Sequence, residues 1–212
     1  MEAVLSHYQA SELLSARAGG SCCGEISTDL GLTRQVVKLG QDGVELNAGE
    51  AVSWEVVEAI VGDKSGCYII KAGEAKKVQL FSSVTGRSLS LYPTTGAPTM
   101  LVSGIPMHRI KDTDPYQDTL KKIRTLKPVV GRVLDTTTGL GYTAIEAART
   151  AAEVITIELD PAALEIARNN PWSQSLFSNP KIRQVIGDSF EVIQEFESGM
   201  FTRIIHDPPV FS

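Results

Sequence analysis

The sequence is poor in the residues that mark secreted and metal-binding proteins. Among its 212 residues there are three cysteines, Cys22, Cys23 and Cys67, and three histidines. An odd cysteine count with two neighbours in sequence argues against a disulfide framework and predicts a reducing, cytoplasmic location. There is no C-x-x-C pair and the histidines show no ligand spacing, so no metal site is predicted.

Long apolar segments and a strong basic charge are lacking as well. No apolar run approaches the roughly 20 residues that span a bilayer, and residues 1–17 lack the basic start and apolar core of a secretory signal, so no membrane partner is expected. The net charge is −5. Tight nonspecific binding of nucleic acid relies on clustered Lys and Arg, so charge does not favour a nucleic-acid partner. The one basic cluster, residues 121–127, fits the solvated face of a helix.

Residues 132–142, RVLDTTTGLGY, carry the most informative pattern. A short apolar run ends in Asp135, a small-residue loop containing Gly139 and Gly141 follows, and an alanine-rich helix is predicted over 143–150. The two glycines let a ligand approach the backbone at a helix N-terminus, which suits a nucleotide-type cofactor. An ordinary strand-to-helix turn without a ligand would produce the same pattern.

Acids also end the next three predicted strands. Residues 154–157 run into Glu158, and an acid about 20 residues after the first strand can accept hydrogen bonds from ribose hydroxyls. Asp160 precedes a proline and is expected to cap the next helix. Residues 182–186 lead to Asp188, and residues 201–206 lead to Asp207. Since ligands bind outside the carboxyl ends of strands in open α/β sheets, four such acids indicate one binding site.

On these motifs, the chain from about Gly131 onward resembles the class I S-adenosylmethionine-dependent methyltransferases. The segments VLDTTTGLGYTA, IELDP, GDSFE and IIHDPPVFS are most similar to predicted archaeal-type methyltransferases related to spermidine synthases. The resemblance implies S-adenosyl-L-methionine as the cofactor. The residues implied to bind it are Asp135, Thr137, Gly139 and Gly141 at the methionine end, Glu158 at the ribose, and Asp188 and Ser189, with Phe190, at the adenine. Many members have glycine where Thr137 stands.

The same resemblance places Asp207 and Pro208 at the substrate as the catalytic residues. A carboxylate beside a backbone carbonyl can accept hydrogen bonds from an amino group and orient its lone pair toward an electrophilic methyl group. Asp-Pro-Pro-aromatic sequences resemble those of amino-directed methyltransferases. Here Val210 stands at the aromatic position, which leaves Phe211 to stack on a base. A rigid Pro-Pro turn that only ends the strand is the alternative.

The preceding residues follow a different pattern. Residues 1–112 are predicted to form a small, mostly antiparallel β-domain, residues 113–128 a linking helix, and residues 129–212 the cofactor domain. The expected elements are a short helix near 10–16 and strands at 35–39, 44–46, 66–71, 77–81, 88–92 and 101–102, with a hairpin turn at 40–43. A similar N-terminal module occurs in spermidine-synthase-like enzymes. The expected role of this β-domain is to shape the substrate entrance or to form an oligomer contact.

The expected fold class is therefore α/β, with a Rossmann-like class I methyltransferase domain that is truncated at its C-terminal end. Class I methyltransferases have seven-stranded sheets, and four strands are predicted here, in the order 3-2-1-4 by analogy. The fourth strand would be an open edge, which favours association with another chain such as a second copy.

The predicted function is methyl transfer from S-adenosyl-L-methionine to an amino or related nucleophile on an unidentified substrate. A spermidine-synthase-like aminopropyl transferase is one alternative, although the loop TTTGLG and the Asp-Pro-Pro motif differ from the usual polyamine-synthase patterns. A non-catalytic cofactor-binding fragment is another. A dehydrogenase fits less well, because an acid before the glycine loop, Asp135, is typical of methyltransferases.

Overall fold

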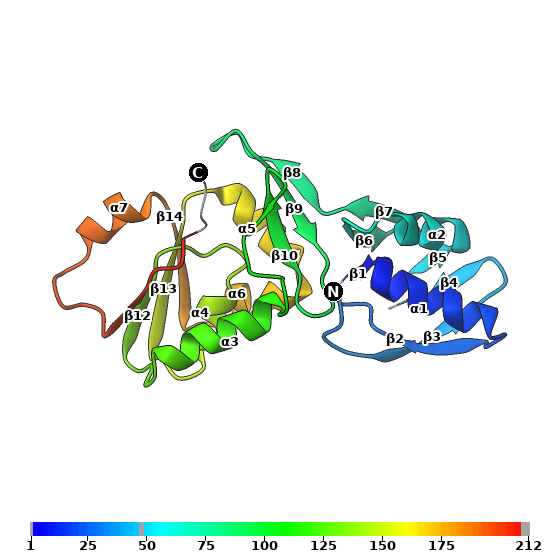
Figure 1. The fold of residues 1–212 in the computed structure, drawn as a ribbon, viewed down its shortest axis with the longest axis horizontal. Helices are drawn as coiled ribbons and strands as arrows, with labels where there is room; N and C mark the ends of the chain where they lie inside the picture. The colour runs from blue at the N-terminus through cyan, green and yellow to red at the C-terminus, as the bar shows by residue number, and fades with distance from the viewer. Residues whose placement is uncertain (1, 47–48, 209–212) are drawn as a thin grey trace.

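The computed structural model describes residues 2–46 and 49–208. Figure 1 shows an elongated molecule in which a central antiparallel sheet lies between a lobe with a parallel sheet and a lobe built from the N-terminal residues. No helix within the two described ranges is long and apolar enough to cross a lipid bilayer.

The parallel sheet carries the motifs that the sequence singled out. Its four strands are β12 (Arg132–Asp135), β13 (Glu153–Glu158), β14 (Ile182–Ile186) and β15 (Arg203–Ile205). They pair in the order β14-β13-β12-β15, which is the expected 3-2-1-4, and β15 is an edge of the sheet as far as the chain is described. Val133 and Leu134 are neighbours in β12 but belong to two different buried clusters. The sheet is thus covered on both faces, which explains its continuous apolar runs.

Helices connect these strands, and the helix after β13 begins at the predicted cap, Asp160. They are α3 (Pro115–Thr125), α4 (Tyr142–Ala148), α5 (Pro161–Arg168), α6 (Gln174–Ser178) and α7 (Ser189–Val192), with 3₁₀ turns η1 (Pro171–Ser173) and η2 (Ile193–Glu195). Asp114 and Asp160 are the N-caps of α3 and α5, and each precedes a proline in the first turn. Helix α3 packs against α4, where the Tyr116 hydroxyl donates a hydrogen bond to Glu146 at 2.5 Å.

The central sheet is antiparallel and packs on the lobe that contains the parallel sheet. Its strands, in the order β11-β10-β9-β8, are β8 (Gln79–Phe81), β9 (Ser88–Tyr92), β10 (Thr99–Val102) and β11 (Ile105–Pro106). Strands β8 and β9 contact α5. Leu91 and Met100 lie in the same buried cluster as Val133, so the central and parallel sheets share one hydrophobic core.

The N-terminal lobe contains two antiparallel sheets, β2-β3-β4-β5 and β1-β6-β7. Its elements are β1 (Ala3–Ser6), α1 (His7–Ala18), β2 (Cys23–Ile26), β3 (Gln35–Leu39), β4 (Gly43–Glu45), β5 (Ala51–Ser53), α2 (Trp54–Gly62), β6 (Cys67–Lys71) and β7 (Glu74–Lys77). Strands β3 and β4 form the expected hairpin. Strands β1, β2 and β5 and helix α2 were not predicted. Helix α2 follows β5 without a glycine or proline between them, because Ser53 caps it directly.

The strand expected over residues 77–81 was wrong as a single element. Strand β7 ends at Lys77 and β8 begins at Gln79, and the two belong to different sheets. Val78 between them is buried, with 3% of its surface exposed. The apolar alternation continues through this point, so the pattern of the sequence gives no sign that the chain passes from one sheet to the next.

Candidate functional site

A cavity of about 240 Å³ lies at the carboxyl ends of β12, β13 and β14. Five of the predicted cofactor residues line it: Thr137, Gly139, Glu158, Asp188 and Ser189. The rest of the wall includes residues of the central sheet and its turns, namely Thr85, Arg87, Leu89, Met100, Val102 and Met107. None of this second group was predicted as a site residue, since antiparallel strands of ordinary composition carry no signal for a ligand.

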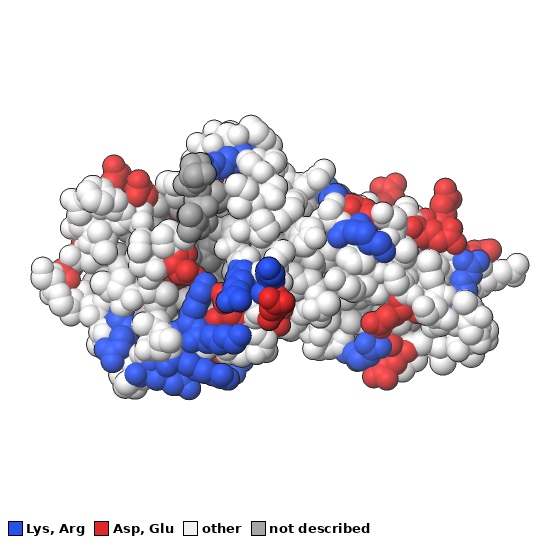
Figure 2. All heavy atoms as spheres, viewed as in Figure 1, with Lys and Arg blue, Asp and Glu red and all other residues white. Residues whose placement is uncertain are grey.

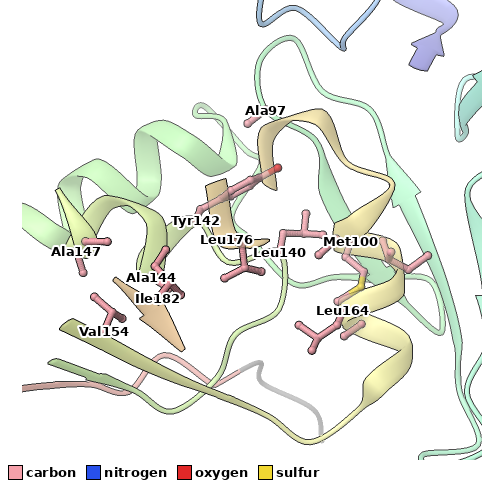
Figure 3. Close-up of a cluster of buried hydrophobic side chains, with 14 of the residues drawn as sticks. Ala97, Met100, Leu140, Tyr142, Ala144, Ala147, Val154, Leu164, Leu176 and Ile182 are labelled. Atoms are coloured by element: carbon pink, nitrogen blue, oxygen red, sulfur yellow. The ribbon is translucent and has the colours of Figure 1, made fainter. Parts of the chain in front are cut away.

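The loop between β12 and α4 is held by its buried leucine and its two glycines. Leu140 is fully buried and points into the cluster that contains Tyr142 and Leu176 (Figure 3). Gly139 (φ +52°) lines the cavity, and a Cβ there would lie 3.5 Å from Met107. Gly141 (φ +77°) does not line it, because a Cβ there would lie 2.6 Å from Leu176 Cδ2. Gly141 therefore serves the turn and the packing of α6.

Glu158 ties the glycine loop to the end of β13. Its Oε2 accepts a hydrogen bond from the Gly139 N–H at 2.8 Å, and its Oε1 accepts one from the Asp160 N–H at 3.0 Å. Burial raises the pKa of the Glu158 carboxyl above its usual value, whereas the two backbone donors oppose that shift. A carboxylate oxygen has room for a second hydrogen bond, so Glu158 can still accept from ligand hydroxyls in the cavity that it lines.

Asp135 lies beneath the cavity and does not line it. The residue is 1% exposed, and burial raises the pKa of its carboxyl to about 7. Oδ2 accepts a hydrogen bond from the Thr156 hydroxyl at 3.0 Å. The backbone N–H of Thr137 also opposes the rise in the pKa of this carboxyl. By hydrogen-bond geometry, Asp135 Oδ1 and the buried Thr137 hydroxyl have no partner among the described residues. Unsatisfied buried polar atoms are rare and costly, so these two atoms are candidates for hydrogen bonds to a polar ligand.

Asp188 and Ser189 close the cavity at the end of β14. Asp188 also caps α7, because its Oδ1 accepts a hydrogen bond from the Phe190 N–H at 2.8 Å. Phe190 is 76% exposed and lies next to these two residues in the chain. An exposed aromatic ring at this position is free to cover a bound planar group.

Asp207 lies outside the cavity, in a shallow hollow between β15 and α3. Its Oδ2 accepts a hydrogen bond from Lys122 Nζ at 2.5 Å, and the same ammonium lies 2.9 Å from Asp118. Figure 2 shows Lys and Arg side chains gathered over α3, the region of the basic cluster in the sequence. The sequence predicted Lys122 to lie on the solvated face of a helix. The i, i+4 spacing between Asp118 and Lys122 could also have predicted their ion pair.

Pro208 is exposed and follows Asp207 directly. Neither residue lines the cavity, so their catalytic role stays a prediction. The preceding His206 is held by the end of β12, since its Nδ1 lies 2.8 Å from the Thr136 hydroxyl. The predictions about Val210 and Phe211 concern residues outside the described part of the chain.

A model of the family described as "Conserved hypothetical protein 95" matches residues 105–211, which is 107 of the 212 residues. The chain belongs to this family. The match covers the linking helix and the parallel sheet, with every predicted site residue. An uncharacterized protein of Methanocaldococcus jannaschii is 44% identical over 162 residues, covering 76% of this member of the family and 54% of the relative.

Two solved spermidine synthases are similar to this family member in fold. The enzyme from Thermotoga maritima aligns with a TM-score of 0.52 and 22% identity over 68% of this chain and 52% of the other. A spermidine synthase in complex with the transition-state analogue AdoDATO aligns with a TM-score of 0.51 and 23% identity, over 61% and 46% of the two chains. The expected mixed α/β fold with a parallel sheet is confirmed. The chain spans about half the length of the relatives it matches.

Proposed function

We propose that the cavity binds S-adenosyl-L-methionine and that the chain is the cofactor-binding part of a methyltransferase acting on an amino or related nucleophile. The observation that carries the proposal is the position of Glu158, between the Gly139 loop and Asp188 in one cavity. An acid at the strand end beside a glycine loop is the group that binds the ribose hydroxyls in nucleotide-binding α/β folds.

The donor and acceptor chemistry of the walls fits this ligand. Glu158 and Asp188 in the wall are acceptors that match the ribose hydroxyls and the adenine amino group. Beneath the wall, the unpartnered Oδ1 of Asp135 is an acceptor that matches the ammonium group of the methionine moiety. Glu158 would hold the ribose and Asp188 the adenine. Leu89, Met100 and Met107 add an apolar wall suited to a nucleoside.

The bound cofactor would supply an electrophilic methyl group on a sulfonium. The task left to the protein is to hold the acceptor in line and to receive its proton. Asp207 is our candidate for that task, with its carboxylate held by Lys122 at the end of β15. A spermidine synthase of this fold was crystallised with AdoDATO, which supports an adenosyl-type ligand in the fold and keeps aminopropyl transfer as the second candidate.

Isothermal titration calorimetry on a sample shown to be folded tests the proposal. S-adenosylhomocysteine should bind with one site per chain, and NAD should not bind. A preference for decarboxylated S-adenosylmethionine over S-adenosyl-L-methionine would favour aminopropyl transfer. Binding of NAD, with no heat from either adenosyl ligand, would overturn the assignment. Binding without turnover on any amino compound would leave the non-catalytic alternative.

A further inference from the structure

The turn between β8 and β9 is bonded to the loop that follows β13. The Ser82 hydroxyl donates a hydrogen bond to Asp160 Oδ1 at 2.8 Å, and the Thr85 hydroxyl donates one to Asp160 Oδ2 at 2.8 Å. These partners are separated by 78 and 75 residues in the sequence. Figure 1 shows the β8–β9 hairpin standing beside α5, the helix that Asp160 caps.

The capping role of Asp160 does not account for these contacts. The cap requires one acceptor, and Oδ1 supplies it to the Ala162 N–H at 3.0 Å. The second oxygen is bonded to the hairpin through Thr85. Ser82 is 2% exposed, and its oxygen also accepts hydrogen bonds from the N–H groups of Val84 and Thr85. The turn is therefore ordered internally and fixed to Asp160 at two points.

The same hydrogen-bond network reaches the glycine loop. The Asp160 N–H donates to Glu158 Oε1, and the Gly139 N–H donates to Glu158 Oε2. A continuous path thus joins the hairpin, Asp160, Glu158 and the loop after β12. Thr85 and Arg87 of the hairpin line the same cavity as Glu158. The carboxylate that would hold the ribose and the hairpin that walls its cavity are positioned by one residue.

We propose that the β8–β9 hairpin is a pre-formed wall of the nucleoside site, and that Asp160 is the positioning residue that holds it there. The inference rests on the proposed function, since it takes the ligand to be an adenosyl cofactor. A wall that is ordered before binding lowers the conformational entropy that the ligand must remove, so it strengthens binding and slows dissociation. Its loss should therefore change ligand affinity more than it changes the stability of the free protein.

The test uses three variants of the hairpin and S-adenosylhomocysteine as the probe. Thr85→Val keeps the shape of the side chain and removes the hydroxyl that bonds Asp160 Oδ2. Thr85→Ser keeps the hydroxyl and removes only the methyl group. Ser83→Ala changes an exposed residue of the same turn that has no bond to Asp160. Affinity and dissociation rate are measured by calorimetry and surface plasmon resonance, together with the melting temperature without ligand.

Thr85→Val should weaken S-adenosylhomocysteine binding about fivefold to tenfold, mainly through faster dissociation, with Thr85→Ser and Ser83→Ala within about twofold of the unaltered protein. A Thr85→Val variant that melts at a lower temperature but binds equally well would overturn the proposal. The contact would then only hold the hairpin against α5 and stabilise the fold. An equal loss in Ser83→Ala would overturn it too. Hydrogen exchange on the unaltered protein gives a second readout: the amides of residues 82–87 should exchange slowly without ligand and more slowly still with S-adenosylhomocysteine bound. Fast exchange there in the free protein contradicts a pre-formed wall.

The outcomes separate this inference from the proposed function. If the unaltered, folded protein does not bind S-adenosylhomocysteine, the proposed cofactor is wrong and the inference fails with it. If the unaltered protein binds and the hairpin variants bind equally, only the role of the hairpin is wrong. If Thr85→Val does not fold, hydrogen exchange on the unaltered protein decides.

Discussion

The Glu158 carboxylate accepts a hydrogen bond from the backbone N–H of Gly139 at 2.8 Å, across the carboxyl ends of β13 and β12. The acid thus fixes the loop that lines the cavity and lines it as well. This double contact separates Glu158 from an ordinary acid at a strand end, which would face solvent. A substitution of Glu158 should therefore also disturb the position of the glycine loop.

Replacement of Glu158 by Ala should lower the affinity for S-adenosylhomocysteine at least about tenfold, because charge-assisted hydrogen bonds to the ribose are lost. Glu158→Gln keeps the size of the side chain and one acceptor oxygen, so its effect should be smaller. Glu153→Gln is the matched control at the other end of β13, where the side chain pairs with Arg132 at 2.5 Å. Calorimetry on the three variants measures the effect, and unchanged affinity in Glu158→Ala would leave that residue as a loop anchor alone.

Replacement of Asp207 by Ala should lower methyl transfer about 100-fold or more, since positioning and proton acceptance are both lost. The affinity for S-adenosylhomocysteine should stay within about threefold, because Asp207 lies outside the cavity. Turnover is measured with an acceptor found by screening amino compounds against labelled S-adenosyl-L-methionine.

Asp118→Asn is the control for that experiment, because it removes the other carboxylate on Lys122 and leaves Asp207 in place. Its turnover should stay within about threefold of the unaltered protein. Full activity in Asp207→Ala would make Asp207 a turn residue. A large loss of S-adenosylhomocysteine affinity in the same variant would instead show that Asp207 binds the cofactor and not the substrate.

The free energy of unfolding should fall as the pH rises from about 4 to about 7 on account of Asp135. Burial raises the folded-state pKa of this carboxyl to about 7, above the unfolded value of 3.8. The unfolded state therefore releases its proton first, and the stabilisation present at low pH is lost as the pH rises through 7. The contribution is on the order of 4 kcal/mol.

Asp135→Asn should remove this slope, so the variant should gain stability relative to the unaltered protein between pH 4 and 7. Urea unfolding at several pH values measures the difference between the two proteins. The difference between the two proteins cancels the pH dependence that the other carboxyls contribute. One of these is Asp63: burial would raise its pKa, but hydrogen bonds from Lys77, Ser65 and Tyr68 hold that pKa below its usual value. Parallel pH profiles for the two proteins would show that Asp135 is ionised in the folded state.

Gly141→Ala should destabilise the protein by about 2–4 kcal/mol, because it combines a positive φ with a Cβ that overlaps Leu176. Gly104→Ala is the matched control, since its φ is +83° but a Cβ there meets nothing within 4 Å. That variant should lose about 1 kcal/mol. Thermal unfolding compares the two, and equal losses would mean that the contact with Leu176 relaxes freely.

The repeating strand–turn–helix units of the parallel sheet were readable from the sequence. The strand at Ile182–Ile186 and the cap Asp160 were predicted at the residues where they occur. These signals are local: a buried strand needs a short apolar run, and a helix start needs an acceptor within three residues. The placement of Glu158 and Asp188 around one cavity followed from the rule for open α/β sheets.

The sequence by itself therefore determined the strand–turn–helix units of the parallel sheet and pointed to Gly139, Glu158 and Asp188. The family resemblance added the strand order and the other two predicted residues that line the cavity. Only the tertiary structure decided that Gly141 packs on Leu176, that Lys122 holds Asp207, and that the β8–β9 hairpin walls the cavity. The physical reason is sequence distance. The alternation of an antiparallel strand shows that one face is buried, but not against what. A carboxylate such as Asp160 reads as a helix cap until the fold brings Ser82 and Thr85, 78 and 75 residues away, within hydrogen-bonding distance.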